Sequence, residues 1–182
     1  MKSLSHTLLV LGLCATLPSH ATDFQLSSPS LPPGGRLPDK HVLNGFGCQG
    51  GNLSPALKWD DAPAGTQSFA ITAYDPDAPT GSGWWHWVVY NLPASTRALP
   101  ENASQNGSLP TGTVEGRTDF GSKGYGGACP PASDPAHRYI FTVHALKTPR
   151  IDLPADASAA MVGFMLHMNR LGSASMYVTY HR

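Results

Sequence analysis

The stretch Arg138-Tyr-Ile-Phe-Thr-Val-His-Ala-Leu146 has the alternating pattern of a β-strand. Side chains two positions apart lie on the same side of a strand, and aromatic and β-branched residues favour this conformation. Both sides are fairly apolar, which indicates a strand inside a sandwich rather than a sheet with one wet face. One side would carry Tyr139, Phe141, Val143 and Ala145, and the other Ile140, Thr142, His144 and Leu146.

Three further segments predict strands: Ser68–Tyr74, Trp85–Asn91 and Ser175–Tyr180. No helices alternate with them, which argues against a parallel nucleotide-binding sheet. Gly (19) and Pro (17) are both frequent, as expected for many turns between short strands. The fold class that we expect is therefore mostly β, an antiparallel sandwich.

One late helix is expected over Ala157–Met168, with Asp156 as its N-cap. Four apolar side chains recur at helical spacing along it and predict a stripe that faces the core. A methionine-rich stripe is also compatible with a metal or a partner, but core packing is the more common role. The stripe consists of Met161, Phe164, Met165 and Met168.

The composition is that of one globular domain. The chain has 182 residues, 41% of them hydrophobic, which suits a single domain with a sizeable core. Its 12 Lys and Arg balance 12 Asp and Glu, so the formal net charge is zero. Nucleic-acid binding needs a basic excess to neutralise phosphates, so this composition argues against it.

The first 21 residues have the pattern of a signal peptide. Lys2 gives the positive start, residues 8–13 give a short apolar core, and Ser19-His-Ala21 resembles a cleavage site. The apolar run is too short to span a bilayer, so we expect no integral membrane segment. Cleavage after Ala21 would leave one domain over residues 22–182, in the periplasm or secreted.

Two cysteines, Cys48 and Cys129, would remain after cleavage. An oxidising compartment and an even number of cysteines predict a disulfide between them. It would close a loop of about 80 residues and contribute about 4 kcal/mol in the chain-entropy model. The alternative is a pair of buried free thiols.

A glycine-rich motif that contains Cys48 matches a dinucleotide-binding loop in its spacing alone. Residues 45–50 read Gly-Phe-Gly-Cys-Gln-Gly, which has the spacing of a dinucleotide-binding loop. Such a loop must open a helix, but Asn52, Ser54 and Pro55 follow and oppose one. We therefore interpret the motif as a glycine-rich turn.

Two carboxylates follow the first strong strand, in Asp75-Pro-Asp-Ala-Pro79. Residues two positions apart in an extended chain point to the same side, so Asp75 and Asp77 are expected to face one site. The prolines would hold the pair rigid. The alternative for such a segment is a solvated turn.

Aromatic and imidazole side chains gather in two later segments. In Trp84-Trp-His-Trp87, His86 would face away from Trp85 and Trp87 if those two share a strand face. Exposed tryptophan is costly, so the segment indicates a cleft, an interface or ordinary core. His137 and Tyr139 would share one strand face, while Arg138 points away and could pair with Asp75 or Asp77.

These segments, in this order, resemble the phosphatidylethanolamine-binding protein family, in its bacterial, Raf-kinase-inhibitor-like branch. The resemblance covers nearly the whole chain after the signal peptide, from Asn52-Leu-Ser-Pro55 to His137-Arg-Tyr139. It implies a Greek-key-like β-sandwich with a shallow pocket that binds phosphate, acetate, phosphorylethanolamine or phosphotyrosine-like groups. The ligand-binding residues that it implies are Asp75, Asp77, His86, Pro130, Pro131, His137 and Tyr139.

The function that we expect is therefore that of an exported binding protein, not an enzyme. Its partners would be a small anionic or zwitterionic ligand and, as an inhibitor or effector, envelope or host proteins. We expect no catalytic residue, no metal and no cofactor. One alternative is a hydrolase or metal-binding protein that uses the Asp and His cluster, although no nucleophile motif marks one. Another is a homodimer with the tryptophans at its interface.

Overall fold

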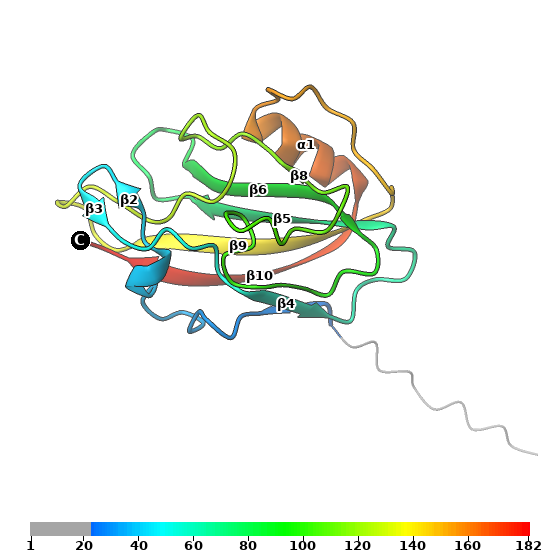
Figure 1. Cartoon of the computed structure of the whole chain (residues 1–182), viewed down its shortest axis with the longest axis horizontal. Coiled ribbons are helices and arrows are strands. Elements are labelled where there is room, and N and C mark those ends of the chain that lie inside the picture. Colours follow the sequence, from blue (N-terminus) through cyan, green and yellow to red (C-terminus); the bar gives the residue numbers. More distant parts are fainter. Residues whose placement is uncertain (1–22) are drawn as a thin grey trace, which may run out of the picture.

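The computed structural model describes residues 23–182, so the signal peptide expected at residues 1–21 lies outside the described part. Two antiparallel sheets face each other, and one helix lies on the far side of the larger sheet (Figure 1). The large sheet has the order β10 (Arg170–Tyr180), β9 (His137–Leu146), β5 (Ser68–Asp75), β6 (Trp84–Pro93) and β8 (Val114–Glu115). The small sheet has the order β1 (Gln25–Ser27), β4 (Leu57–Asp60) and β7 (Ala98–Leu99).

The larger sheet is buried on both faces at its centre. Phe69 and Ile71 of β5 join the main core between the two sheets, where the ring centroids of Phe69 and Trp59 are 5.5 Å apart. Ala70, on the opposite face of β5, joins a second core beneath the helix. This double burial explains why both faces of the strand are apolar, and the mostly-β sandwich prediction is confirmed.

All four predicted strands are present; β5, β6 and β9 are one or two residues longer than predicted at one or both ends, and β10 begins at Arg170 instead of Ser175. β9 pairs with β5 on one side and with β10 on the other, with Phe141 opposite Ala73 and Met176. The alternation predicted for β9 holds: Tyr139 and Phe141 are buried in the main core, and Arg138 is exposed. Register is well defined here because a slip by one residue would expose the whole apolar set.

The helix differs from its prediction in where it begins. α1 spans Ala159–Asn169, and its N-cap is Ser158 rather than Asp156. The Ser158 hydroxyl accepts a hydrogen bond from the Met161 amide at 3.2 Å. Serine is as good an N-cap as aspartate, and Ala159, the first residue of the helix, is buried against the second core.

The predicted core stripe of the helix was wrong for three of its four residues, because within it only Met165 packs, partly buried, against the second core. Met161, Phe164 and Met168 are 49–58% exposed, whereas Ala159, Val162 and Leu166 are buried against the sheet. Nearly every position of the helix is apolar, so spacing alone could not identify the buried face. Gly163 lies on the side that faces the sheet, where a Cβ would be 3.4 Å from the Trp85 ring.

This assignment predicts unequal effects of substitutions on the helix. Leu166→Ala should lower the free energy of unfolding by about 2–5 kcal/mol, because it leaves a cavity in a fully buried site. Met161→Gln and Met168→Gln should each change it by no more than about 0.5 kcal/mol, because these side chains already lie in water. Urea denaturation measures both. A large loss from either glutamine variant would contradict the exposed orientation.

A small hairpin caps one end of the sandwich, beside the C-terminal end of the chain (Figure 1). It consists of β2 (Asn44–Gly45) and β3 (Cys48–Gln49) and follows the 3-10 helix η1 (Asp39–His41). Most of the glycine-rich motif at residues 45–50 lies in this hairpin. As expected, the motif is a turn: Phe46 at its tip has a φ of 50° and Gly47 a φ of 84°. The hairpin carries a disulfide from Cys48 to Cys129, in agreement with the cysteine prediction.

Candidate ligand-binding site

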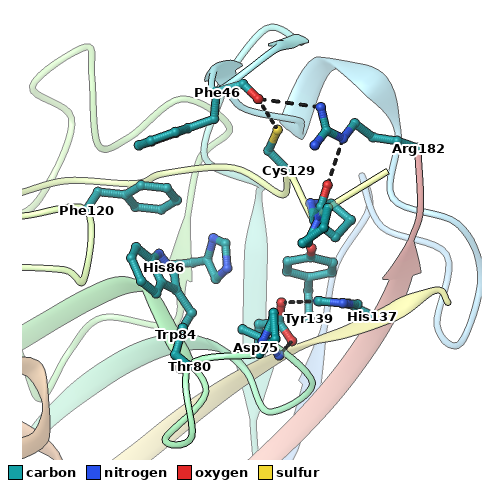
Figure 2. A pocket seen from close by; sticks show the side chains of 14 residues that line it. Phe46, Asp75, Thr80, Trp84, His86, Phe120, Cys129, His137, Tyr139 and Arg182 are labelled. Atoms are coloured by element: carbon teal, nitrogen blue, oxygen red, sulfur yellow. Dashed lines mark hydrogen bonds and ion pairs between the residues drawn. The ribbon is translucent and has the colours of Figure 1, made fainter. Parts of the chain in front are cut away.

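A pocket of about 400 Å³ opens at the end of the sandwich that carries the β2–β3 hairpin (Figure 2). Its floor is polar and buried, and its walls are mostly aromatic rings and prolines. The floor consists of Asp75, His86, His137 and Tyr139, and the walls include Phe46, Pro79, Trp84, Phe120, Pro130 and Pro131. The predicted ligand-binding residues therefore come together here, with the exception of Asp77.

Asp75 and His137 form a buried pair at the floor. His137 Nδ1 lies 2.8 Å from Asp75 Oδ2, and its Nε2 lies 3.2 Å from Asp134 Oδ2. Both ring nitrogens are therefore occupied by carboxylates. Asp75 Oδ1 accepts the amides of Asp77 and Ala78 at 2.8 and 3.1 Å. The pair is thus fully hydrogen-bonded within the protein and shapes the floor rather than offering free donors to a ligand.

Asp77 does not face the pocket, so the prediction that it shares a side with Asp75 was wrong. The strand ends at Asp75, and the Asp75 carboxylate accepts the Asp77 amide in a tight turn. The alternation of the strand therefore does not continue to Asp77, whose side chain points away from the pocket. Asp77 instead binds Arg138 through two side-chain contacts of 2.7 and 2.9 Å. Hydrogen bonding from the Arg138 guanidinium lowers the pKa of Asp77 to about 2.

His86 reaches the pocket because of a β-bulge. The pairing of β5 with β6 shifts between Ala73 and Tyr74, which leaves His86 as an extra residue between Trp85 and Trp87. A bulge changes which way the following side chains point. Trp85 therefore packs beneath the helix, whereas Trp87 enters the main core and His86 the pocket. The expectation that Trp85 and Trp87 share a face, opposite His86, was wrong for this reason.

The His86 ring presents one free nitrogen to the site. Its Nδ1 lies 2.8 Å from the Gly126 carbonyl, which fixes a proton on that nitrogen. Burial lowers the pKa of His86 below its ordinary 6.5, and this outweighs the opposing effects of the Gly126 carbonyl and of the Asp75 and Asp119 carboxylates. His86 is therefore neutral near pH 7, and its Nε2 is left as an acceptor facing the pocket.

Tyr139 stands against His86, with ring centroids 5.1 Å apart and nearly perpendicular. Its hydroxyl is buried and makes no hydrogen bond of ordinary geometry among residues 23–182, although the Asp75 carboxylate is close enough to affect its pKa. Burial raises the pKa of this hydroxyl, so it stays protonated and able to donate. An unpaired buried hydroxyl costs free energy, and an oxygen atom of a ligand in the pocket could supply the missing partner.

Several pocket residues were not predicted. Phe120 joins the walls from a loop and contacts Phe46, Trp84 and His86, with ring centroids 5.3–5.9 Å apart. Arg182 stands at the mouth, the end of the pocket formed with Phe46, opposite Asp75 (Figure 2). Its guanidinium donates to the Pro130 carbonyl at 2.7 Å and to the Phe46 carbonyl at 3.5 Å. No motif marks either residue, because only the fold brings them to the site.

The three tryptophans do not form one patch. Trp87 is fully buried, Trp84 lines the pocket and Trp85 packs beneath α1, so the three side chains do not share one surface. Within residues 23–182, no helix is long and apolar enough to cross a membrane. In the same range, no three His, Cys, Asp or Glu side chains are grouped so that they could hold a metal ion.

Fold and pocket together define a class of binding protein, and comparison with known proteins identifies the family. Residues 27–181 match the family model described as phosphatidylethanolamine-binding protein. The chain therefore belongs to the phosphatidylethanolamine-binding protein family, which confirms the resemblance seen in the sequence.

Bacterial relatives support the same conclusion. The UPF0098 protein YbhB of Escherichia coli K12 is 58% identical over 153 residues, which cover 84% of this chain and 96% of YbhB. The UPF0098 protein YbcL of the same strain is 49% identical over 178 residues, covering 96% of this chain and 97% of YbcL. The crystal structure of E. coli YbcL, described as a new member of the mammalian PEBP family, matches with a TM-score of 0.85 and 50% identity, covering 88% of this chain and 99% of YbcL's.

Proposed function

We propose that this protein is an exported, non-enzymatic binding protein whose pocket takes a small phosphate-bearing or zwitterionic group. One observation carries the proposal: the Tyr139 hydroxyl is buried at the floor without a hydrogen bond of ordinary geometry within residues 23–182, and it stands against the His86 ring, whose Nδ1 is held by the Gly126 carbonyl. Two convergent polar groups among apolar walls are typical of small-ligand sites. An oxygen of a phosphate or carboxylate could accept from the Tyr139 hydroxyl, and it could accept from His86 Nε2 once that ring takes up a proton.

The state of the reactive side chains favours binding over hydrolysis. Three side chains that line the pocket carry a hydroxyl or a sulfur atom: Thr80, Cys129 and Tyr139, and burial keeps the Tyr139 hydroxyl protonated. The Thr80 hydroxyl donates to the Gly83 carbonyl, and the Cys129 sulfur is in the disulfide. Asp75 accepts three hydrogen bonds, which makes it a poor general base.

Export is the second part of the proposal, and it rests on the signal-peptide pattern and on the disulfide, which persists in oxidising compartments. Partners bearing the bound group would then be envelope or host proteins or lipids. Fractionation of cells that express the full chain tests this. A periplasmic or secreted protein that begins at Thr22 supports export, and an unprocessed cytoplasmic protein contradicts it.

Calorimetric titration with phosphoethanolamine and with phosphotyrosine tests the pocket. We expect saturable binding by the wild-type protein that is weakened about tenfold or more in His86→Asn, because one hydrogen bond to a charged group is lost. An asparagine amide can still donate to the Gly126 carbonyl, so this variant removes Nε2 while keeping the structural contact.

Tyr139→Phe is the companion variant, because it removes a hydroxyl that makes no hydrogen bond of ordinary geometry within the described residues. It should weaken binding without lowering thermal stability. Absence of binding by the folded wild-type protein, or undiminished binding by both variants, would contradict the proposed function.

Binding of an anion should also depend on pH. An anion at Nε2 favours the charged form of His86, so it raises a pKa that burial holds below 6.5 in the free protein. Binding then takes up a proton: affinity is greatest below the pKa of the free protein and falls as pH rises through the higher pKa of the complex. Tyrosine sulfate is a suitable probe, because its charge is constant from about pH 5 to about pH 8, the range in which histidine titrates. A flat profile that matches His86→Asn would contradict this role.

A further inference from the structure

The floor of the pocket has no net positive charge to offer an anion. His137 lies between the carboxylates of Asp75 and Asp134, so even a protonated ring leaves this group with a net negative charge. His86 is neutral near pH 7 because of its burial. An anionic ligand therefore needs a positive charge from elsewhere in the pocket.

Arg182 supplies that charge. Among the described residues that line the pocket, it is the one lysine or arginine. It lies at the mouth, at the opposite end from Asp75, where the chain end meets the β2–β3 hairpin (Figure 2). The negative floor and the positive mouth thus divide the pocket into two ends of unlike charge.

The guanidinium of Arg182 also has donors to spare. It carries five N–H groups, and its contacts go to two neutral backbone carbonyls, those of Pro130 and Phe46. Hydrogen bonds between a guanidinium and an oxyanion are roughly twice as strong as those between neutral groups, and two can form side by side. Exchanging a long contact with a carbonyl for an anion is therefore favourable.

Arg138 provides the contrast. It lies on the same end of the molecule, but Asp77 holds its guanidinium through two contacts of 2.7 and 2.9 Å. It does not line the pocket. Of these two arginines, Arg182 is the one that is aimed at the pocket without a carboxylate partner.

We propose that Arg182 is the anion-binding residue of this pocket, and that its guanidinium binds the negatively charged group of the ligand. The inference rests on the proposed function and adds to it the side-chain group that binds the negative charge of the ligand. The ligand would place its phosphate between the mouth and His86, with its apolar part against Phe46 and Phe120. Lysine could supply the charge but not the planar fork.

Titration of phosphoethanolamine into the wild-type protein and the variants Arg182→Gln, Arg182→Lys and Arg138→Gln, at low and at raised ionic strength, tests this. Arg182→Gln should bind about tenfold or more weakly, with a flatter dependence on salt. Arg182→Lys should fall between it and the wild type. Arg138→Gln should bind like the wild type, because its charge is already used by Asp77.

Salt dependence separates recognition from a structural role. If Arg182 only ties Pro130 to Phe46, Arg182→Gln loses affinity but keeps the wild-type response to salt, and the inference is overturned. Binding by Arg182→Gln that equals the wild type also overturns it, while the proposed function stands. Failure of the wild-type protein to bind phosphoethanolamine or phosphotyrosine at all overturns both.

Discussion

Replacing both cysteines, in the double variant Cys48→Ala and Cys129→Ala, should lower the free energy of unfolding by about 4 kcal/mol. The disulfide closes a separation of 81 residues, so it removes many conformations from the unfolded chain. It also joins the hairpin that carries Phe46 to the wall that carries Pro130, on either side of the pocket. Urea denaturation of the oxidised protein and of the variant measures the loss.

Reduction of the wild-type protein is the matched control, because it breaks the same bond without changing any side chain in the core. It should lower the stability by a similar amount, and adding reductant to the variant should change nothing. Equal stability of the oxidised protein, the reduced protein and the variant would contradict the role assigned to the disulfide.

The second large effect is expected at the floor, where Asp75→Ala should cost about 3 kcal/mol of stability. The substitution leaves a buried His137 next to an empty space and removes the acceptor of the Asp77 and Ala78 amides. Asp75 is only 2% exposed, so water cannot replace the lost contacts without rearrangement. Thermal or urea unfolding followed by circular dichroism measures the change.

Asp77→Asn is the control for Asp75→Ala, because it changes a carboxylate two residues away that pairs with an exposed arginine. Exposed ion pairs contribute little to stability, so its effect should be much smaller. Comparable losses from both substitutions would show that Asp75 has no special place in the floor.

The strands were predictable because their alternation is strictly local. Each residue of the stretch 138–146 alternates faces without reference to its partners, and β9 follows that alternation. The helix was predicted in kind but not in orientation. Its sequence is apolar on nearly every side, and contacts of Ala159, Val162 and Gly163 with the sheet decide which face is buried.

The candidate site was predictable only in part, for a related reason. Asp75, His86, His137 and Tyr139 belong to motifs that the family resemblance identifies, and they do meet at the floor. The direction of His86 depends on a bulge, which is set by the register with the neighbouring strand and leaves no local signal. The Asp77 side chain does not face the pocket because β5 ends at Asp75, and the sequence does not mark that end.

Pocket residues that come from distant segments could not be predicted from their neighbours in the sequence. Phe120 comes from a loop, and Arg182 comes from the end of β10 to contact the hairpin turn at Phe46. Neither lies in a motif, and long-range contacts of this kind are known only once the sheets are assembled. This is why the positive charge at the mouth emerged from the structure.

The most direct test of the central claim is a crystal structure of the protein grown with saturating phosphoethanolamine. The account predicts the molecule in the pocket, with phosphate oxygens within hydrogen-bond reach of His86 Nε2 and of the Arg182 guanidinium. A molecule bound on another surface, with the pocket holding only water in a protein that binds it in solution, would contradict the account.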